Sequence, residues 1–207
     1  MLHLETVEPR TFAVLEKLMT IDALQAFNIV GGTALSLYYG HRTSIDLDLF
    51  CAESFDQSTI ITSVNSAFEG EFKVKSSSNF EISGSVNNVK LTFKWGSNPI
   101  ICPIITKESL RLNAPEDILT MKVKDILDVG NKNDFRDIAE LLNHFEINDF
   151  IELYQQKYGL HFMNIVVPQA ITYFDDAEDS EDPVSLNGLD WNDVKNIIRG
   201  KVRNYLA

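Results

Sequence analysis

The chain of 207 residues is predicted to form a mixed α/β fold, with a mixed sheet in its first half and helices in its second. A short apolar run at 27–30 ends at a glycine pair and is followed by a helical segment and a second apolar run at 45–50, a pattern typical of strand, helix and strand. From Pro115 onward, apolar residues recur at helical spacing. We therefore expect a core over 1–112 and a helical portion over 113–207 that completes the same globule.

The other elements follow in order from proline, asparagine and glycine signals and from apolar spacing. Pro9 suits the first turn of an amphipathic helix, and Asn87 with Asn88 suits a tight turn between two strands. Pro115 and Gly130 are expected to begin and end a helix. The further expected elements are helices over 33–39, 56–68, 134–145, 148–158, 161–173 and 190–206, and strands over 80–86 and 89–95.

The chain is acidic, with 18 Lys and Arg against 30 Asp and Glu and a net charge of −12. Such a chain is not expected to coat nucleic acid nonspecifically, because binding a polyanion depends on neutralising basic side chains. Half of the acidic excess lies in the run 175–182, which holds six acids. We expect this run to be a solvated linker, with a recognition element as the alternative.

Cysteine content and hydropathy indicate the compartment. Cys51 and Cys102 are too few for a disulfide framework, so we expect free thiols and a cytoplasmic protein. No apolar stretch is long enough for a membrane span, and glutamates replace the basic start of a signal peptide in the first 19 residues. We expect no membrane partner.

Two aspartates stand two positions apart in the second apolar run. Asp46 and Asp48 would point to the same side of a strand, since strand side chains alternate between faces. Carboxylates so placed repel each other unless a cation compensates, and Mg²⁺ prefers such hard oxygen ligands. The preceding Gly31 and Gly32 would let backbone N–H groups and a helix N-terminus approach a phosphate. The alternatives are a tight turn at the glycines and a solvated strand edge at the aspartates.

The joint pattern resembles the nucleotidyltransferase superfamily typified by DNA polymerase β, in which a glycine pair is followed by Asp-x-Asp on a strand. Gly-Gly-Thr-Ala-Leu at 31–35 and His-Arg-x-Ser-x-Asp-x-Asp-x-Phe at 41–50 look most like the AbiEii/AbiGii branch, the toxin component of type IV toxin–antitoxin and abortive-infection systems. The resemblance implies a polymerase β-like core, an NTP substrate and Mg²⁺ held by Asp46 and Asp48. The nucleotide-binding residues that it implies are Gly31, Gly32, Thr33, Arg42, Ser44 and Lys122.

A second motif lies in the helical portion. A Met-Lys pair followed by Asn-Asp-Phe-Arg-Asp at 133–137 is similar to the downstream AbiEii-type motif. The resemblance gives Lys122 the role of gripping the triphosphate and Asp134 that of a site carboxylate, so the expected catalytic residues are Asp46, Asp48, Lys122 and Asp134. An ordinary surface lysine is the alternative for Lys122 taken alone.

The chain departs from the family pattern at two positions. Val129 stands where the family usually has an arginine, and Thr92 stands where polymerase β-like enzymes carry a third carboxylate. A two-residue turn at 87–88 would place Glu81 on the same face as Thr92, one diagonal step away. Glu81 is therefore a candidate substitute acid, and an ion pair with Lys94 on a wet face is the alternative.

These features predict a Mg²⁺-dependent nucleotidyltransferase that passes a nucleotidyl group from an NTP to a hydroxyl. The resemblance suggests an RNA acceptor such as a tRNA 3′ end, or a protein side chain, and a cognate antitoxin as partner. Loss of a third acid should lower the rate more than nucleotide binding. The first alternative is thus a degenerate module that binds a nucleotide or a partner without turnover, and the second is a purely structural protein.

Overall fold

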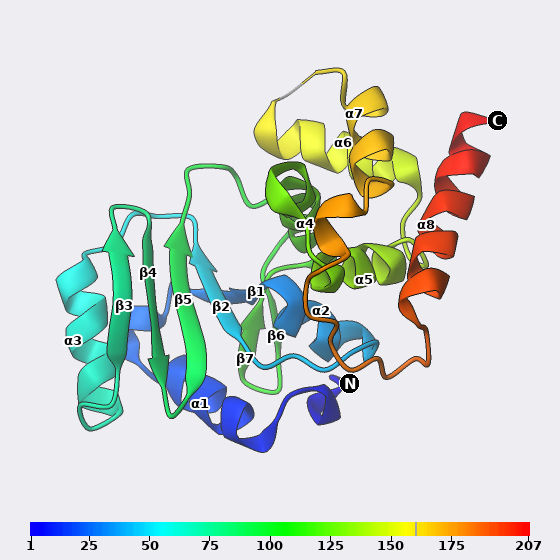
Figure 1. The fold of residues 1–207 in the computed structure, drawn as a ribbon. Helices are drawn as coiled ribbons and strands as arrows, with labels where there is room; N and C mark the ends of the chain where they lie inside the picture. The colour runs from blue at the N-terminus through cyan, green and yellow to red at the C-terminus, as the bar shows by residue number, and fades with distance from the viewer. Residues whose placement is uncertain (160) are drawn as a thin grey trace.

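The computed structural model describes residues 1–159 and 161–207. Within that part of the chain the strands are β1 (Asn28–Val30), β2 (Leu47–Cys51), β3 (Lys73–Ser78), β4 (Glu81–Val86), β5 (Val89–Trp95), β6 (Ile105–Lys107) and β7 (Leu110–Leu112). They form a seven-stranded mixed sheet in the order β3-β4-β5-β2-β1-β7-β6 (Figure 1). β1 pairs antiparallel with β2 and parallel with β7, and β2 pairs parallel with β5.

The helices form one group beside the strands and a second group in the C-terminal half of the chain (Figure 1). Their bounds are α1 (Pro9–Met19), α2 (Gly31–Tyr39), α3 (Gln57–Ala67), α4 (Pro115–Val129), α5 (Lys132–Leu141), α6 (Ile147–Tyr158), α7 (Met163–Ile171) and α8 (Trp191–Leu206), with short 3-10 helices at Leu4–Thr6, Asp22–Leu24 and Asp175–Ala177. α2 joins the two groups because it contacts β1 and β2 as well as α4 and α5. The predicted mixed α/β fold with a helical C-terminal portion is confirmed.

The sheet has an apolar face and a polar face, as the alternation of strand side chains requires. On β5, Leu91 and Phe93 are fully buried, whereas Lys90 and Lys94 are exposed. On β2, Asp48 is half-buried between two buried leucines. The polar face therefore carries the charged side chains that the sequence motif singled out.

The strand register places Thr92, at the position of the third carboxylate, next to the Asp-x-Asp motif. Asp48 on β2 is the partner of Thr92 on β5, and Glu81 on β4 is the partner of Lys94 on β5. The turn at 87–88 has positive φ at both asparagines, 52° and 66°. The predicted hairpin register is confirmed, and Thr92 lies beside Asp48 on the polar face.

The strand that carries the motif starts later than predicted. β2 begins at Leu47, so Asp46 lies just before the strand instead of within it. The backbone carbonyl of Asp46 accepts a hydrogen bond from the Thr33 hydroxyl instead of from a neighbouring strand. The backbone at 46 is thereby tied to α2, while the Asp46 side chain pairs with Lys90 on β5.

Three strands were not expected from the sequence. β3 is exposed along its whole length and is rich in lysine and serine, so it shows no apolar alternation. β6 and β7 have only three residues each, too few to show a period. β3 and β6 are the two edge strands, which need little apolar burial to add to an existing sheet, whereas β7 lies between β1 and β6 and was missed because it is short.

Two helix ends differ from their predicted form. Gly130 follows the last residue of α4, but its φ is −73°, so the position does not require the left-handed conformation. A Cβ at Gly130 would lie 3.1 Å from side-chain atoms of both Ile126 and Phe135, so close packing favours glycine there. α5 begins two residues before the predicted start because Asn131 caps it.

The two cysteines differ in burial. Cys51 is buried and Cys102 is half-buried, and both are free. Burial raises the pKa of the Cys51 thiol, which favours the protonated and less reactive form. Across residues 1–159 and 161–207, no helix combines the length and the apolar character needed to cross a membrane.

Candidate active site

A pocket of about 680 Å³ lies where the start of β2 meets α2, α4, α5 and the segment 181–184. Most of the predicted site residues line it: Gly32, Thr33, Arg42, Ser44, Asp46, Asp48, Lys122 and Asp134. Of the residues that the structure describes, neither Glu81 nor Thr92 is part of the wall. The fold thus brings the glycine turn, the Asp-x-Asp motif and the Lys-Asp motif to one place.

Asp46 and Asp48 lie on the open side of the pocket. The Asp46 side chain is 45% exposed, and its Oδ2 lies 3.3 Å from the Nζ of Lys90, which is itself 62% exposed. Asp48 is the strand partner of Val30, the residue before the glycine pair. Gly31 has a φ of +68°, and a Cβ there would lie 3.1 Å from Oδ2 of Asp48. A side chain at position 31 would be strained and would crowd this carboxylate.

The second glycine of the turn makes room for an arginine. A Cβ at Gly32 would lie 1.9 Å from Nη2 of Arg42. That guanidinium is fixed by a bidentate pair with Asp137, with Nε–Oδ1 at 2.7 Å and Nη2–Oδ2 at 2.9 Å. Position 32 must therefore stay glycine for Arg42 to reach Asp137, whatever else the glycine does.

Asp137 is the centre of a buried charge network. Besides Arg42, its carboxylate binds Nε2 of His41 at 2.8 Å and Nζ of Lys122 at 2.9 Å, and its side chain is 0% exposed. Burial alone would raise the pKa of Asp137, but the charges of Arg42 and Lys122 and the hydrogen bonds from His41 and Arg42 hold it well below its usual range. The ionised form of Asp137 is thus built into the fold. We call His41, Arg42, Lys122, Asp134 and Asp137 the inner network.

Lys122 reaches the pocket from within this network. Its side chain is 7% exposed, and its Nζ also lies 2.7 Å from Oδ1 of Asp134. Burial opposes the charged form, but the carboxylates of Asp137 and Asp134 outweigh it and raise the pKa of Lys122. Asp134 accepts a second bond from the backbone N–H of Asn131 at 3.2 Å, which fixes it at the start of α5. Lys124 points elsewhere and pairs with an exposed aspartate.

The start of α2 is tied to the chain before β2. The hydroxyls of Thr33 and Ser44 are 2.8 Å apart in buried surroundings, and the Thr33 hydroxyl also donates to the carbonyl of Asp46. Within the described chain, no side chain caps the N-terminus of α2. The first backbone N–H groups of the helix are therefore free to bind an anion.

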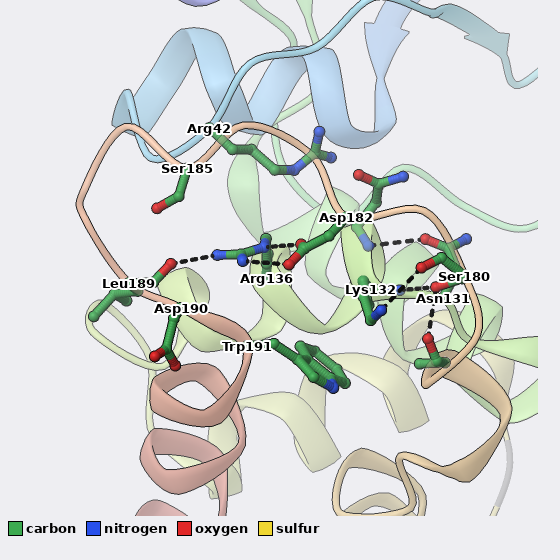
Figure 2. A network of polar contacts seen from close by, with 12 residues as sticks. Arg42, Asn131, Lys132, Arg136, Ser180, Asp182, Ser185, Leu189, Asp190 and Trp191 are labelled. Atoms are coloured by element: carbon green, nitrogen blue, oxygen red, sulfur yellow. Dashed lines mark hydrogen bonds and ion pairs between the residues drawn. The ribbon is translucent and has the colours of Figure 1, made fainter.

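The end of the acidic run is not a free linker. We call residues 180–190 the strap, which leads from the acidic run to α8 (Figure 2). Asp182 binds Arg136 in a bidentate pair, with Nε–Oδ1 at 2.6 Å and Nη2–Oδ2 at 2.8 Å, and Arg136 also donates to the carbonyl of Leu189 at 2.9 Å. The expectation of a solvated linker is wrong for Asp182, because its carboxylate compensates a largely buried arginine.

Backbone bonds hold the strap against the pocket. The N–H of Thr43 donates to the carbonyl of Val184 at 3.0 Å, and the N–H of Leu186 donates to the carbonyl of His41 at 2.9 Å. At its other end, Ser180 accepts a bond from the backbone N–H of Lys132 at 2.9 Å (Figure 2). The strap therefore forms one wall of the pocket next to the Asp-x-Asp motif.

The positions that depart from the family pattern have different surroundings. Thr92 is buried beside Asp48, so no carboxylate stands at that point of the sheet. Glu81 lies 3.5 Å from the Nζ of Lys94, the ion pair given as the alternative to a substitute acid. Val129 is 71% exposed at the end of α4 and lines the pocket.

Sequence reasoning missed the centre of the inner network. Asp137 was noted only as part of a motif, and His41 only as part of another, although both side chains are buried and paired. Their separation of 96 residues hides the contact from any local pattern. The usable signal was the helical pattern, since Ile138 and Leu141 lie next to Asp137 on a helix and indicate burial, and a buried acid needs a cation.

Comparisons with known proteins agree with this arrangement. Residues 14–196 match the family described as nucleotidyl transferase AbiEii toxin, type IV TA system. An uncharacterised protein of Aquifex aeolicus is 28% identical over 202 residues, which cover 93% of this chain and 94% of that protein.

Solved structures share the fold at low sequence identity. JHP933 from Helicobacter pylori has a TM-score of 0.59 at 16% identity and covers 96% of this chain and 92% of its own. MenT4, a nucleotidyltransferase toxin from Mycobacterium tuberculosis, has a TM-score of 0.58 at 13% identity and covers 94% of this chain and 84% of its own. With the family match over most of its length, the chain belongs to the AbiEii family of nucleotidyltransferase toxins.

Proposed function

We propose that the protein is a Mg²⁺-dependent nucleotidyltransferase toxin that passes a nucleotidyl group from an NTP to a hydroxyl of RNA or protein. One observation supports this most. Asp46 and Asp48 lie at the open side of the pocket beside the uncapped start of α2, and their one described cationic partner is the exposed Lys90. A carboxylate pair next to free N–H groups suits a metal ion together with a phosphate chain.

The residues present fit a magnesium ion. Asp46 and Asp48 supply hard oxygen atoms, and the exposed Lys90 can move aside from Asp46 when a cation binds. Within the described residues, no group of three His, Cys, Asp or Glu side chains is placed to hold an ion. Phosphate oxygens and water would therefore complete the coordination, as is usual for Mg²⁺. When bound, the ion would polarise the phosphoryl group as a Lewis acid.

The chain itself would bind and orient the nucleotide. The N–H groups at the start of α2, from Gly31 to Thr33, would face the phosphates. Lys122 would add positive charge to the outer phosphates from the opposite wall, with Asp134 and Asp137 fixing its ammonium in place. In this proposal Arg42 and Ser44 act behind the nucleotide, by holding the glycine turn and the segment before β2.

The acceptor and the partner are the less constrained parts of the proposal. We propose RNA, tRNA included, as the first acceptor class and a cognate antitoxin as partner, because the family is described by its toxin–antitoxin system. A module that binds nucleotide without turnover is the second candidate function. The observation that favours it is Thr92, which leaves no carboxylate beside Asp48 on β5.

The test is label transfer by the purified full-length protein. We would incubate it with Mg²⁺, each of the four α-labelled NTPs in turn, and total RNA, purified tRNA or total protein as acceptor. We expect one acceptor class to take up label. The double variant Asp46→Asn/Asp48→Asn should lower transfer by about 100-fold or more, because Lewis-acid stabilisation is worth several kcal/mol.

The matched control is Lys124→Ala, which removes a charge from the exposed side of α4 and should leave transfer unchanged. Equal transfer by the wild type and the double aspartate variant would overturn the proposed site. If the wild type binds Mg²⁺ and NTP but labels no acceptor, the binding module replaces the enzyme as the better account.

A further inference from the structure

One face of α4 forms a wall of the pocket. Lys122, Asp125, Asp128 and Val129 all line it. Their spacing of three or four residues is that of neighbours on one side of a helix. Asp125 follows Lys122 by one turn, so its carboxylate stands on the same wall as the ammonium that the proposed function places near the phosphates.

Asp125, like Asp48, has no fixed partner among the described residues, in contrast to three other carboxylates of the pocket. Asp134 is held by Lys122, Asp182 by Arg136 and Asp128 by Lys124. Among the described residues, Asp125 makes neither an ion pair nor a side-chain hydrogen bond, and it is exposed to solvent. Its oxygen atoms are therefore available to a molecule that enters the pocket.

The charges around Asp125 come from both the sheet and the helices. Although Asp125 is exposed at the pocket, surrounding protein atoms partly desolvate its carboxyl, and this raises its pKa to about 6. Asp134 and Asp48 add to the rise, while Lys122 and Lys94 oppose it. A carboxyl with a pKa near the working pH can accept a proton and release it again. The groups that shift this pKa come from α4, from the start of α5 and from strands β2 and β5.

We propose that Asp125 is the general base for the acceptor hydroxyl. It would take the role of the strand carboxylate whose position Thr92 occupies in this chain. The proposal rests on the nucleotidyl transfer proposed above. The hydroxyl oxygen would form a bond to the α-phosphorus, and the bond from that phosphorus to the bridging oxygen would break, so that pyrophosphate leaves with the electron pair. The hydroxyl proton would pass to a carboxylate oxygen of Asp125 and from there to solvent.

The geometry favours a base over a third metal ligand. No group of three acids or other ligand side chains among the described residues is arranged around one point, so Asp125 does not complete a cluster with Asp46 and Asp48. Asp125 lines the pocket from α4 beside Lys122, and in this proposal the acceptor lies between it and the nucleotide. Glu81, the earlier candidate, is outside the pocket wall and paired with Lys94.

The experiment compares Asp125→Asn and Asp125→Glu with the wild type. The variants Asp48→Asn, Glu181→Gln and Glu152→Gln are measured alongside them. Each protein is used in two measurements. The first is the single-turnover rate of label transfer from a saturating α-labelled NTP with Mg²⁺ to total RNA or total protein. The second is the calorimetric Kd of the same Mg²⁺–NTP without acceptor. Glu152→Gln is the matched control, because it removes an exposed acid on α6 that lies outside the described pocket wall.

We expect Asp125→Asn to lower the transfer rate by about 10²- to 10⁴-fold, the usual contribution of a general base. Its Kd for Mg²⁺–NTP should stay within about threefold of the wild type, because a base acts on the acceptor and not on the bound nucleotide. Asp125→Glu should recover part of the rate, and Glu152→Gln should match the wild type in both measurements.

Three results would overturn the role of Asp125 as general base. The first is an Asp125→Asn variant that transfers label at the wild-type rate. The second is an Asp125→Asn variant that loses Mg²⁺–NTP affinity as strongly as Asp48→Asn does, which would make Asp125 a metal ligand. A loss of rate in Glu181→Gln instead would move the base to the strap. Each of these leaves the proposed transfer standing, whereas a wild type that binds Mg²⁺–NTP and labels no acceptor overturns the transfer and the base with it.

Discussion

The two sides of the pocket differ in whether their charged side chains are paired. On the inner side, the inner network joins two acids to Arg42, Lys122 and His41 at distances of 2.7 to 2.9 Å, and all of these side chains are buried. On the open side, Asp48 and Asp125 have no described cation partner, and Asp46 has only an exposed lysine. The inner charges are satisfied within the fold and the outer ones are not.

This difference separates residues that stabilise the structure of the site from residues that are free to bind a ligand. A buried charge pair is kept because removing one member leaves the other uncompensated. Unpaired carboxylates that face one cavity repel each other and gain from a bound cation. We therefore expect variants of the inner side to lose stability first and variants of the open side to lose ligand binding first.

The largest effect on stability should come from Asp137→Asn. The change leaves Arg42 and Lys122 buried without their shared anion, which should cost about 3 to 5 kcal/mol in the free energy of unfolding. Chemical denaturation followed by tryptophan fluorescence and circular dichroism measures it. The matched control is Asp117→Asn. Asp117 lies outside the pocket wall, and its carboxylate is 2.5 Å from the Nζ of Lys157 in a buried pair, so the change should cost a similar free energy.

The pH dependence of the same variant sharpens the comparison. The folded-state pKa of Asp137 is far below its usual range, so its contribution to stability is complete above the unfolded pKa of about 3.9 and is lost as pH falls toward the folded value. The stability difference between wild type and Asp137→Asn should thus shrink as pH falls below about 4. A difference that stayed constant from pH 7 to pH 3 would show that Asp137 is not held ionised by the network.

A smaller effect is expected at the strap. Asp182 pairs with Arg136, but the Asp182 side chain is 35% exposed, so solvent screens part of the interaction. Asp182→Asn should lower the free energy of unfolding by about 1 kcal/mol, because one of the two charge-assisted bonds to Arg136 is lost while the amide oxygen still accepts the other. It should also speed proteolysis within residues 180–190.

Asp128→Asn is the control for the effect of Asp182→Asn on the free energy of unfolding, because it breaks only an exposed ion pair. That pair joins Asp128 to Lys124 one turn away on α4, and its loss should change the free energy of unfolding by less than about 0.5 kcal/mol. Equal effects of Asp182→Asn and Asp128→Asn, with unchanged proteolysis, would mean that the strap is held by its backbone bonds alone.

Local patterns in the sequence predicted the fold and the aspartate pair on the open side of the site. The glycine pair, the Asp-x-Asp motif and the two-residue turn at 87–88 are each read within a few residues, and the hairpin register that follows from the turn is confirmed. The contact between Lys122 and Asp134 could also be predicted from the sequence, because the two residues are 12 apart and belong to one motif.

The inner network and the strap were beyond local patterns. Arg42 and Asp137 are 95 residues apart, and Arg136 and Asp182 are 46 apart, so only the folded chain shows that they pair. Asp125 has the opposite problem, since an exposed acid on a helix has the same sequence pattern as a solvated one. Its place on the pocket wall depends on how α4 packs against the sheet.

The central claim is that Asp46 and Asp48 hold a metal ion that the nucleotide shares. Isothermal calorimetry of each NTP with and without Mg²⁺, on the wild type and on Asp46→Asn/Asp48→Asn, tests it most directly. We expect Mg²⁺ to tighten NTP binding in the wild type and to have no such effect in the double variant, which should remain folded because the change removes a repulsion. The same Mg²⁺-dependent gain in both proteins would contradict the account.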